Sequence, residues 1–228
     1  AEGARRCAQI SYDMFLRTKQ RNEAVLSCVP ILFSWPSRGS ALPYLHDGTN
    51  AEVSAALFQD FLINLAKRTG ATDIVVLAHS MGSRPVIAAL ERIGIGNMLG
   101  PKDRLREMIL AAPDFDRNLF LNAAREVMRA VSRVTLYASG ADKALAASKK
   151  LNGGARLGDA DGGICTMKGM DSIDATSAGN DIFGHSNFAT SKVMLDIYDI
   201  IVNRKTTSER SFSLLPVGDP PSYWQIKP

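Results

Sequence analysis

The sequence contains little cysteine and little histidine, and it lacks a long apolar run. Three of the 228 residues are cysteines and three are histidines. The cysteines, Cys7, Cys28 and Cys165, show no C-x-x-C spacing, which, with so few histidines, argues against a zinc or iron–sulfur site. Their odd number argues against a disulfide framework. No apolar run reaches the roughly 18 residues that a membrane-spanning helix needs. We therefore expect no metal, no other cofactor and no membrane span.

Dense charge is also lacking. The formal net charge is +4, but the lysines and arginines are scattered, and the densest clusters, at residues 17–21 and 203–205, are short. Such clusters are typical of a solvated face, so we expect no nucleic-acid partner. No charged-then-apolar signal segment opens the chain. The compartment, cytoplasm or cell envelope, and the oligomeric state stay open at this point.

Apolar residues make up 46% of the sequence, which is enough for a sizeable core in one domain of this length. Apolar segments rich in β-branched residues alternate with helical patterns, which predicts βαβ units and a mostly parallel central sheet flanked by helices. We expect a single α/β domain over residues 1–228, in which residues 211–228 form an extended C-terminal tail against the body.

The predicted strands and helices follow from this alternation. The strands span residues 25–33, 73–78, 108–112, 134–138 and 172–175. Helices are predicted over residues 4–19, 83–92, 144–150 and 188–203. Pro30 is unfavourable inside the first strand, because proline has no N–H to donate to a neighbouring strand.

Two further helices have recognisable caps. Thr49-Asn-Ala-Glu52 matches a capping box, so a helix is expected to begin after Thr49 and to end near Gly70. Asp116 is expected to cap a helix that runs to about residue 131.

The pentapeptide Ala78-His-Ser-Met-Gly82 differs by one residue from G-x-S-x-G. It directly follows an apolar strand and precedes a helix, which is where a nucleophile elbow lies. Because that turn is tight, small residues are expected at Ala78 and Gly82. We predict that Ser80 is the nucleophile and that the Met81 backbone N–H, at the start of the helix, stabilises the oxyanion. The alternative is that Ser80 is an ordinary helix N-cap.

A serine nucleophile needs a base, and histidine is the usual one. His185, in Gly184-His-Ser-Asn-Phe188, follows Ser80 in the chain and leads into the last helix, as the chain order of this kind of hydrolase requires. His46 precedes the nucleophile. His79 is adjacent to Ser80, but neighbouring residues in a sharp turn point to different sides. We therefore predict that His185 is the base, the alternative being a surface histidine.

The orienting acid should lie between the nucleophile and the histidine in the chain. Asp142 lies just beyond the strand at 134–138, where a carboxylate can hold the imidazole and stabilise its protonated form. Asp114 follows the preceding strand and is the main rival. Either residue could instead be a loop or capping aspartate. Asp171 and Asp174 are disfavoured because they lie close to His185 in sequence.

Together, these motifs resemble a family of bacterial α/β-hydrolases grouped as domain of unknown function nine hundred, which is esterase-like or lipase-like. The resemblance rests on Phe33-Ser-Trp-Pro-Ser-Arg-Gly39, Tyr44, Asp47, Ala78-His-Ser-Met-Gly82, Ala112-Pro-Asp114, Val134-Thr-Leu-Tyr137, Asp142-Lys-Ala-Leu145, Arg156-Leu-Gly-Asp159, Ile173-Asp174 and Gly184-His-Ser186.

The resemblance implies the α/β-hydrolase fold and a triad of Ser80, Asp142 and His185. It also implies an earlier strand that ends in a His-Gly-containing loop and supplies a second oxyanion donor. No His-Gly precedes Ser80 in this sequence. The expectation is therefore an α/β-hydrolase fold with its N-terminal strands missing from the chain as given, which would leave a sheet edge exposed.

The predicted function is that of a carboxylesterase-like serine hydrolase acting on a small-molecule ester. Trp35, Pro36, Tyr44 and His79 are expected to border the pocket. The stretch between the two candidate acids is too short for a lid, which favours short or soluble esters. Two alternatives stay open, namely a non-catalytic binding or envelope-associated protein that keeps the fold, and an acyltransferase that uses the same triad.

Overall fold

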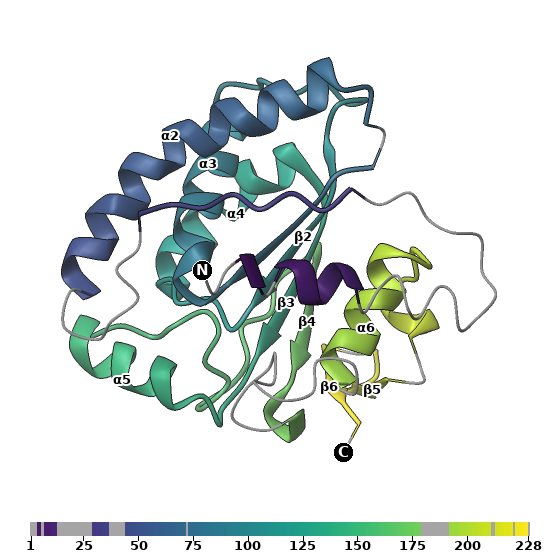
Figure 1. Ribbon diagram of the computed structural model, residues 1–228. Coiled ribbons are helices and arrows are strands. Elements are labelled where there is room, and N and C mark those ends of the chain that lie inside the picture. The colour runs from purple at the N-terminus through teal and green to yellow at the C-terminus, as the bar shows by residue number, and fades with distance from the viewer. Residues whose placement is uncertain are drawn as a thin grey trace.

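A six-stranded sheet forms the centre of the computed structural model (Figure 1). The structure describes residues 4–5, 7–12, 29–36, 44–71, 73–178, 192–210, 213–220 and 222–227, and for residues 44–49 it describes the backbone alone. The strand order is β1-β2-β3-β4-β6-β5. All neighbouring strands pair in parallel except β5 and β6, which form an antiparallel pair. The strands are β1 (Val75–His79), β2 (Leu105–Ala111), β3 (Val131–Ala138), β4 (Met170–Asp174), β5 (Leu214–Val217) and β6 (Tyr223–Ile226).

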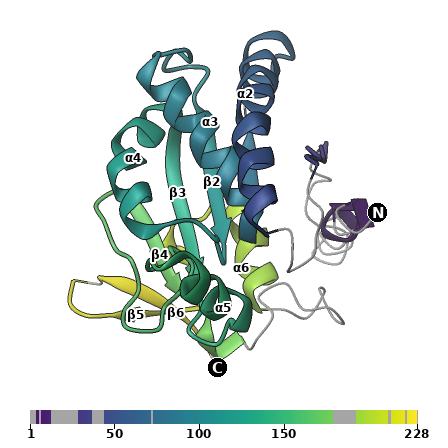
Figure 2. The same ribbon diagram turned by 90° about the vertical axis from the view of Figure 1, so that its left-hand side faces the viewer.

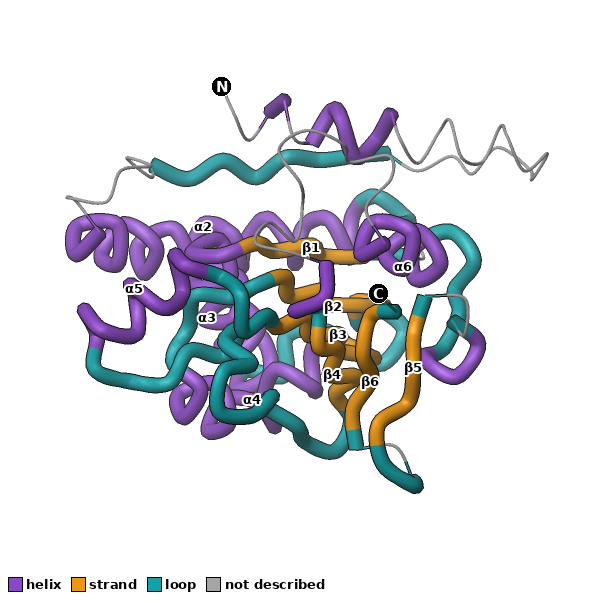
Figure 3. Tube along the Cα trace, turned by 90° about the horizontal axis from the view of Figure 1, so that it is seen from below, coloured by secondary structure: helices purple, strands orange, loops and turns teal. Residues whose placement is uncertain are grey.

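Helices cover both faces of this sheet, as Figures 2 and 3 show. On one face α2, α3 and α4 pack side by side, and α6 lies on the opposite face. The labelled helices are α2 (Tyr44–Arg68), α3 (Ser83–Ile95), α4 (Arg117–Ala130), α5 (Lys143–Asn152) and α6 (Lys192–Ile201), and residues 7–12 are also helical. The described residues also form the short 3-10 turns η1 (Ser80–Gly82), η2 (Thr176–Ala178) and η4 (Thr207–Glu209). The predicted α/β architecture, a mostly parallel sheet flanked by helices, is confirmed.

The core is divided between the two faces by the alternation of side chains along each strand. In β2, Met108 and Leu110 join the larger cluster beneath α2, α3 and α4, whereas Ile109 and Ala111 join the cluster beneath α6. Both faces of β2 are buried from residue 107 to residue 111, and its last four residues, 108–111, are accordingly all apolar. This double burial fixes the register of the central strands and hence the level at which each strand ends.

The strand predicted at residues 25–33 is not found in its described part. Residues 29–33 are extended but belong to no strand, and Val29, Ile31 and Leu32 are exposed. Phe33 instead packs on α2, with its ring centroid 4.6 Å from that of Phe58. This aromatic contact holds the segment against the helix. Among the described residues, β1 pairs only with β2 and is an edge strand.

The capping box predicted at Thr49 is wrong, because α2 already begins at Tyr44 and Thr49 lies within it. Its predicted end is confirmed, since Gly70 follows the helix with a φ of +70°. The cap at Asp116 is also confirmed, because its carboxylate accepts hydrogen bonds from the N–H groups of Asn118 and Leu119.

The described C-terminal residues are paired into the sheet. Residues 214–217 and 223–226 form β5 and β6, and β6 pairs in parallel with β4. Pro216 lies in β5, at the edge of the sheet, where a missing N–H is tolerated. In the described part of the chain, the helices are too short or too polar to cross a membrane.

Candidate active site

Ser80 lies at the turn between β1 and α3 with an uncommon backbone conformation. His79, the last residue of β1, is extended with a φ of −119°, whereas the φ of Ser80 is +51°. A left-handed conformation costs a non-glycine residue on the order of 1–3 kcal/mol, and it persists only where the surroundings impose it. The backbone at Ser80 thus runs from a strand through one strained residue into a helix, which is the geometry that a nucleophile elbow requires.

The chain around Ser80 is held by hydrogen bonds to the Ser80 carbonyl, one of them from the backbone N–H of Ser83. Ser83 Oγ, in the first turn of α3, donates to this oxygen at 2.7 Å. The backbone N–H of Asp114, from the segment after β2, donates to the same oxygen at 3.1 Å. Among the described residues, the Ser80 side-chain hydroxyl has no hydrogen-bond partner. The backbone of the serine is therefore fixed while its hydroxyl is left for another group.

The two small residues of the motif differ in how closely they are packed. Ala78 is buried in the core. A Cβ added to Gly82 would meet no described atom within 4 Å, so crowding by the described residues does not account for glycine there. Met81 lies in η1, directly before α3, and its N–H belongs to the positive end of that helix, where anions are favoured.

Asp142 lies past the carboxyl end of β3 and is the N-cap of α5. Its Oδ1 accepts hydrogen bonds from the N–H groups of Ala144 at 2.9 Å and Leu145 at 3.1 Å. The capping alternative considered for this residue is therefore real. Both bonds fall on one carboxylate oxygen, and the side chain is only partly buried. Capping leaves Oδ2 for another donor.

Asp114 is buried in a cluster of donors. Its Oδ1 accepts from Ser148 Oγ at 2.6 Å and from Arg156 Nε at 3.0 Å. Its Oδ2 lies 3.6 Å from Arg84 Nη2. Only 2% of Asp114 is exposed, so this carboxylate lies between two guanidinium groups rather than at a surface.

His185 lies outside the described residues, but both segments that flank it are described. Directly after β4, Ser177 Oγ donates to the Ile226 carbonyl at 2.7 Å. At the start of α6, Lys192 Nζ donates to the Lys227 carbonyl at 3.0 Å. Ile226 and Lys227 mark the carboxyl end of β6, which is parallel to β4. The chain on either side of His185 is thus anchored at the carboxyl edge of the sheet, the edge that carries Ser80.

The four predicted pocket residues are only partly described. His79 is exposed at the end of β1, and Trp35 is half-buried. Pro36 is exposed, and its carbonyl accepts from Asn50 Nδ2 at 2.9 Å. Tyr44 begins α2, and its side chain lies outside the described residues. Among the described residues, no hydrogen bond joins Trp35 or Pro36 to Ser80.

A cavity of about 280 Å³ opens at the opposite edge of the sheet. Arg104 directly precedes β2, and Met128 and Arg129 lie in the last turn of α4, so these lining residues belong to the amino edge. Ser80 does not line this cavity. The lining residues are Asn97, Leu99, Pro101, Arg104, Met128 and Arg129.

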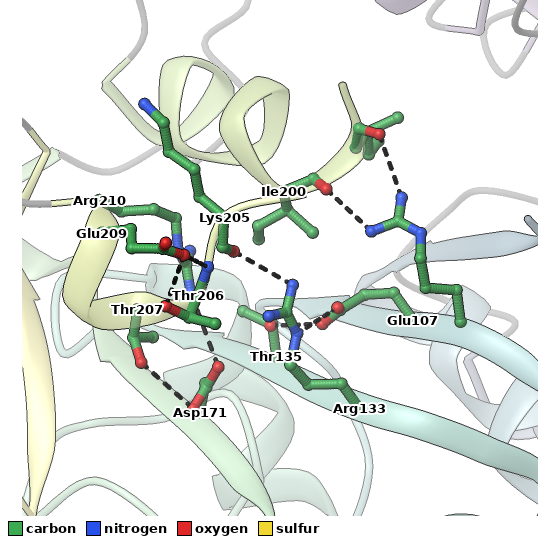
Figure 4. Close-up of polar contacts among 12 residues, drawn as sticks. Glu107, Arg133, Thr135, Asp171, Ile200, Lys205, Thr206, Thr207, Glu209 and Arg210 are labelled. Carbon is green, nitrogen blue, oxygen red and sulfur yellow. Dashed lines mark hydrogen bonds and ion pairs between the residues drawn. The ribbon is translucent and has the colours of Figure 1, made fainter. Parts of the chain in front are cut away.

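A polar layer holds α6 and the segment that follows it on the sheet (Figure 4). Thr135 Oγ1 donates to Glu107 at 2.6 Å, and the Arg133 guanidinium bonds both Glu107 and the Lys205 carbonyl. At the end of α6, Arg106 donates to the carbonyl groups of Ile200 at 2.9 Å and of its neighbour at 3.1 Å. The helix therefore runs from the carboxyl edge, at its start, to the amino edge.

Closer to the middle of α6, Asp196 is fully buried. It accepts hydrogen bonds from Tyr137 Oη at 2.6 Å and from the Arg210 guanidinium. Burial raises the pKa of Asp196 to about 6, although Arg210 and Tyr137 lower it. The neighbouring Asp199 raises it further. This cluster fixes the helix that begins shortly after His185.

Sequence patterns gave no indication of the contacts around Asp114. Ser148, Arg156 and Arg84 come from α5, the following loop and α3, and they are far apart in the chain.

One family model matches residues 1–204, and its description is an alpha/beta hydrolase of unknown function (DUF900). No curated protein and no solved structure matches the chain.

Proposed function

We propose that this chain, which belongs to the α/β-hydrolase family DUF900, is a serine hydrolase. Its proposed substrate is a small carboxylic ester. The observation that carries the proposal is the φ of +51° at Ser80, in a strand–turn–helix arrangement. A strained, non-glycine residue at this position indicates that the backbone is held for the sake of its side chain.

The triad partners are assigned by position. The parallel strands β1, β3 and β4 end at one edge of the sheet, and Ser80, Asp142 and the segment containing His185 follow these three strands in turn. In this proposal Asp142 Oδ2 accepts from His185 Nδ1, which leaves His185 Nε2 to face the Ser80 hydroxyl. Asp142 then fixes the tautomer of the imidazole and stabilises its protonated form.

The proposed reaction has two halves. The Ser80 oxygen bonds to the ester carbonyl carbon while its proton passes to His185, and the Met81 N–H stabilises the oxyanion. The carbon–oxygen bond to the alcohol then breaks, and His185 protonates the leaving alcohol. In the second half a water molecule, deprotonated by His185, attacks the acyl-enzyme. The products are a carboxylic acid and free Ser80.

Small esters are favoured over long lipids by the connection between Asp114 and Asp142. This stretch consists of α4, β3 and their short turns, with no inserted segment that could act as a lid. The substrate class rests on this feature of the described chain and on the fold, which is compatible with a small molecule.

The test is hydrolysis of p-nitrophenyl acetate by the whole chain. Ser80→Ala and His185→Ala should each lower kcat by at least about 1000-fold, because the members of a triad act as a unit. Ser222→Ala, at an exposed serine in the turn before β6, and His46→Ala are the matched controls and should retain activity. Hydrolysis by Ser80→Ala at the wild-type rate would contradict the proposal.

Two other outcomes identify the rival functions. Absence of any hydrolysis by the wild-type chain would favour a non-catalytic binding protein with this fold. Preferential transfer of the acetyl group to an added alcohol, measured by product analysis, would identify an acyltransferase that uses the same residues.

A further inference from the structure

The backbone of Asp114 touches the nucleophile directly. Its N–H donates to the Ser80 carbonyl at 3.1 Å, and its own carbonyl accepts from Arg84 Nε at 3.0 Å. Arg84 lies in the first turn of α3, the helix that follows the nucleophile. The residue after β2 therefore bonds both the elbow and the helix that leaves it.

The side chain of Asp114 accepts hydrogen bonds from residues of two further elements. Ser148, from α5, and Arg156, from the following loop, both donate to Oδ1. Arg156 is 4% exposed, so the ion pair is shielded from water and is screened little by salt. Four segments of the chain thus meet at one carboxylate.

The loop containing Arg156 packs on the residues on either side of Asp114. Gly158 N–H donates to the Pro113 carbonyl at 3.0 Å, and Leu157 N–H donates to the Phe115 carbonyl at 2.8 Å. A Cβ at Gly158 would lie 2.5 Å from backbone atoms of Ala112 and Pro113, so only glycine allows this approach.

Two strained residues lie within this arrangement. Ala112 has a φ of +43° and Ser80 a φ of +51°. Asp114 is hydrogen-bonded to Ser80 and follows Ala112 by two residues in the chain. Left-handed residues other than glycine are maintained only where surrounding contacts over-determine them. The bonds of Asp114 supply such contacts.

We propose that Asp114 is a positioning residue that holds Ser80 in its left-handed conformation, and so directs the hydroxyl toward the base and the ester. This inference rests on the proposed role of Ser80 as nucleophile. Asp114 acts through the backbone of Ser80 and does not touch the reacting atoms.

The same contacts argue against Asp114 as the acid of the triad. An imidazole N–H would have to displace Ser148 or Arg156 from Oδ1, or compete with Arg84 at Oδ2. Asp142, by contrast, uses only Oδ1 for its cap. The geometry therefore separates the two aspartates into an orienting acid and a positioning residue.

The experiment measures the rate at which a fluorophosphonate probe labels the protein, a step in which the serine oxygen bonds to phosphorus and fluoride leaves. Asp114→Asn should lower this rate roughly 10- to 100-fold, because small misplacements of a reacting group are costly. The matched control is Glu107→Gln, another buried carboxylate that accepts from an arginine and a hydroxyl, and it should change the rate by less than about twofold. Equal rates for the two variants would overturn the proposal.

The pH dependence of labelling separates positioning from the acid role. A positioning residue changes the height of the pH–rate curve and leaves its midpoint unchanged. A shift of the midpoint to lower pH in Asp114→Asn would overturn the proposal, because it would show that Asp114 stabilises the protonated imidazole.

Milder variants cover the case in which Asp114→Asn fails to fold. Ser148→Ala removes one donor to Asp114, and Thr135→Val removes the corresponding donor to Glu107. Only Ser148→Ala should slow labelling, and equal rates would overturn the proposal. Unchanged labelling of Ser80→Ala would instead contradict the proposed function, so the two failures are distinguishable.

Discussion

The two ends of strand β2 carry similar buried carboxylates in different surroundings. Glu107, near the amino end, accepts from an arginine and from the hydroxyl of Thr135. Asp114, past the carboxyl end, accepts from Arg156 and from the hydroxyl of Ser148. Both carboxylates are shielded from water, and both have charged and hydroxyl donors.

The difference lies in the backbone that each carboxylate supports. The partners of Glu107 are residues of the adjacent strand β3, in regular sheet conformation, and they connect the sheet to the segment after α6 (Figure 4). The partners of Asp114 come from α3, α5 and a loop, and they surround left-handed residues. Similar ion pairs thus stabilise regular strand conformation around Glu107 and two left-handed residues, Ser80 and Ala112, around Asp114.

The largest expected effect is on catalysis, and it comes from Asp142 at the carboxyl edge. Asp142→Asn should lower the rate of ester hydrolysis roughly 1000- to 10,000-fold, because the imidazole loses the carboxylate that fixes its tautomer. Asp116→Asn is the matched control, since both aspartates cap a helix through Oδ1 and asparagine also caps well. A similar rate for the two variants would show that Asp142 is not the orienting acid.

The next largest effect is on the free energy of unfolding. It is tested by substituting one glycine at each edge of the sheet, Gly158 at the carboxyl edge and Gly100 at the amino edge. Gly158→Ala should lower the free energy of unfolding by about 3 kcal/mol, because the new Cβ would overlap the backbone of Ala112 and Pro113. Gly100→Ala, in the turn before β2, brings its Cβ no closer than 3.5 Å to a described atom.

Urea unfolding measures both variants. Gly100→Ala should stay close to the wild-type value, and Gly158→Ala should also slow fluorophosphonate labelling because it displaces the segment that holds Asp114. Equal free energies of unfolding for the two variants would show that the loop at Gly158 does not pack closely on Ala112 and Pro113.

The smallest effect concerns the α6 side of the sheet. Because burial places the folded-state pKa of Asp196 at about 6, above its ordinary value of 3.8, this group favours the folded state most at low pH, and the contribution is lost as pH rises through about 6. Tyr137, Arg210 and Asp199 are the charged or titratable groups that face it.

Asp196→Asn stays neutral at every pH. The free energy of unfolding of this variant, relative to the wild type, should therefore increase by on the order of 2–3 kcal/mol between pH 4 and pH 7. Urea titrations at several pH values provide the measurement. A relative stability that falls with rising pH would show that the ion pair with Arg210 outweighs burial.

Much of the fold was predictable from the sequence because its signals are local. The strand–turn–helix geometry at Ser80 and the cap at Asp116 each depend on a few adjacent residues, and both are present. The capping box at Thr49 was misleading, because a local motif does not prevent the preceding residues from continuing the helix. The segment ending at Phe33 has strand-like composition, but its described part packs on α2 instead.

The arrangement around Asp114 could not be predicted, because it depends on tertiary contacts. Arg84, Ser148 and Arg156 are brought together only when α3, α5 and the glycine-rich loop have packed. An aspartate after a strand has the same local sequence whether it orients a histidine or pairs with arginine. Burial and partners distinguish the two roles, and neither can be read from spacing along the chain.

The most direct test of the central claim is to label the whole chain with a fluorophosphonate and map the adduct by peptide mass spectrometry. We predict one adduct, on Ser80, that is lost in Ser80→Ala and in His185→Ala and retained in Glu107→Gln. Labelling on another residue, or an adduct that persists in His185→Ala at the wild-type rate, would contradict the account of Ser80 as an activated nucleophile.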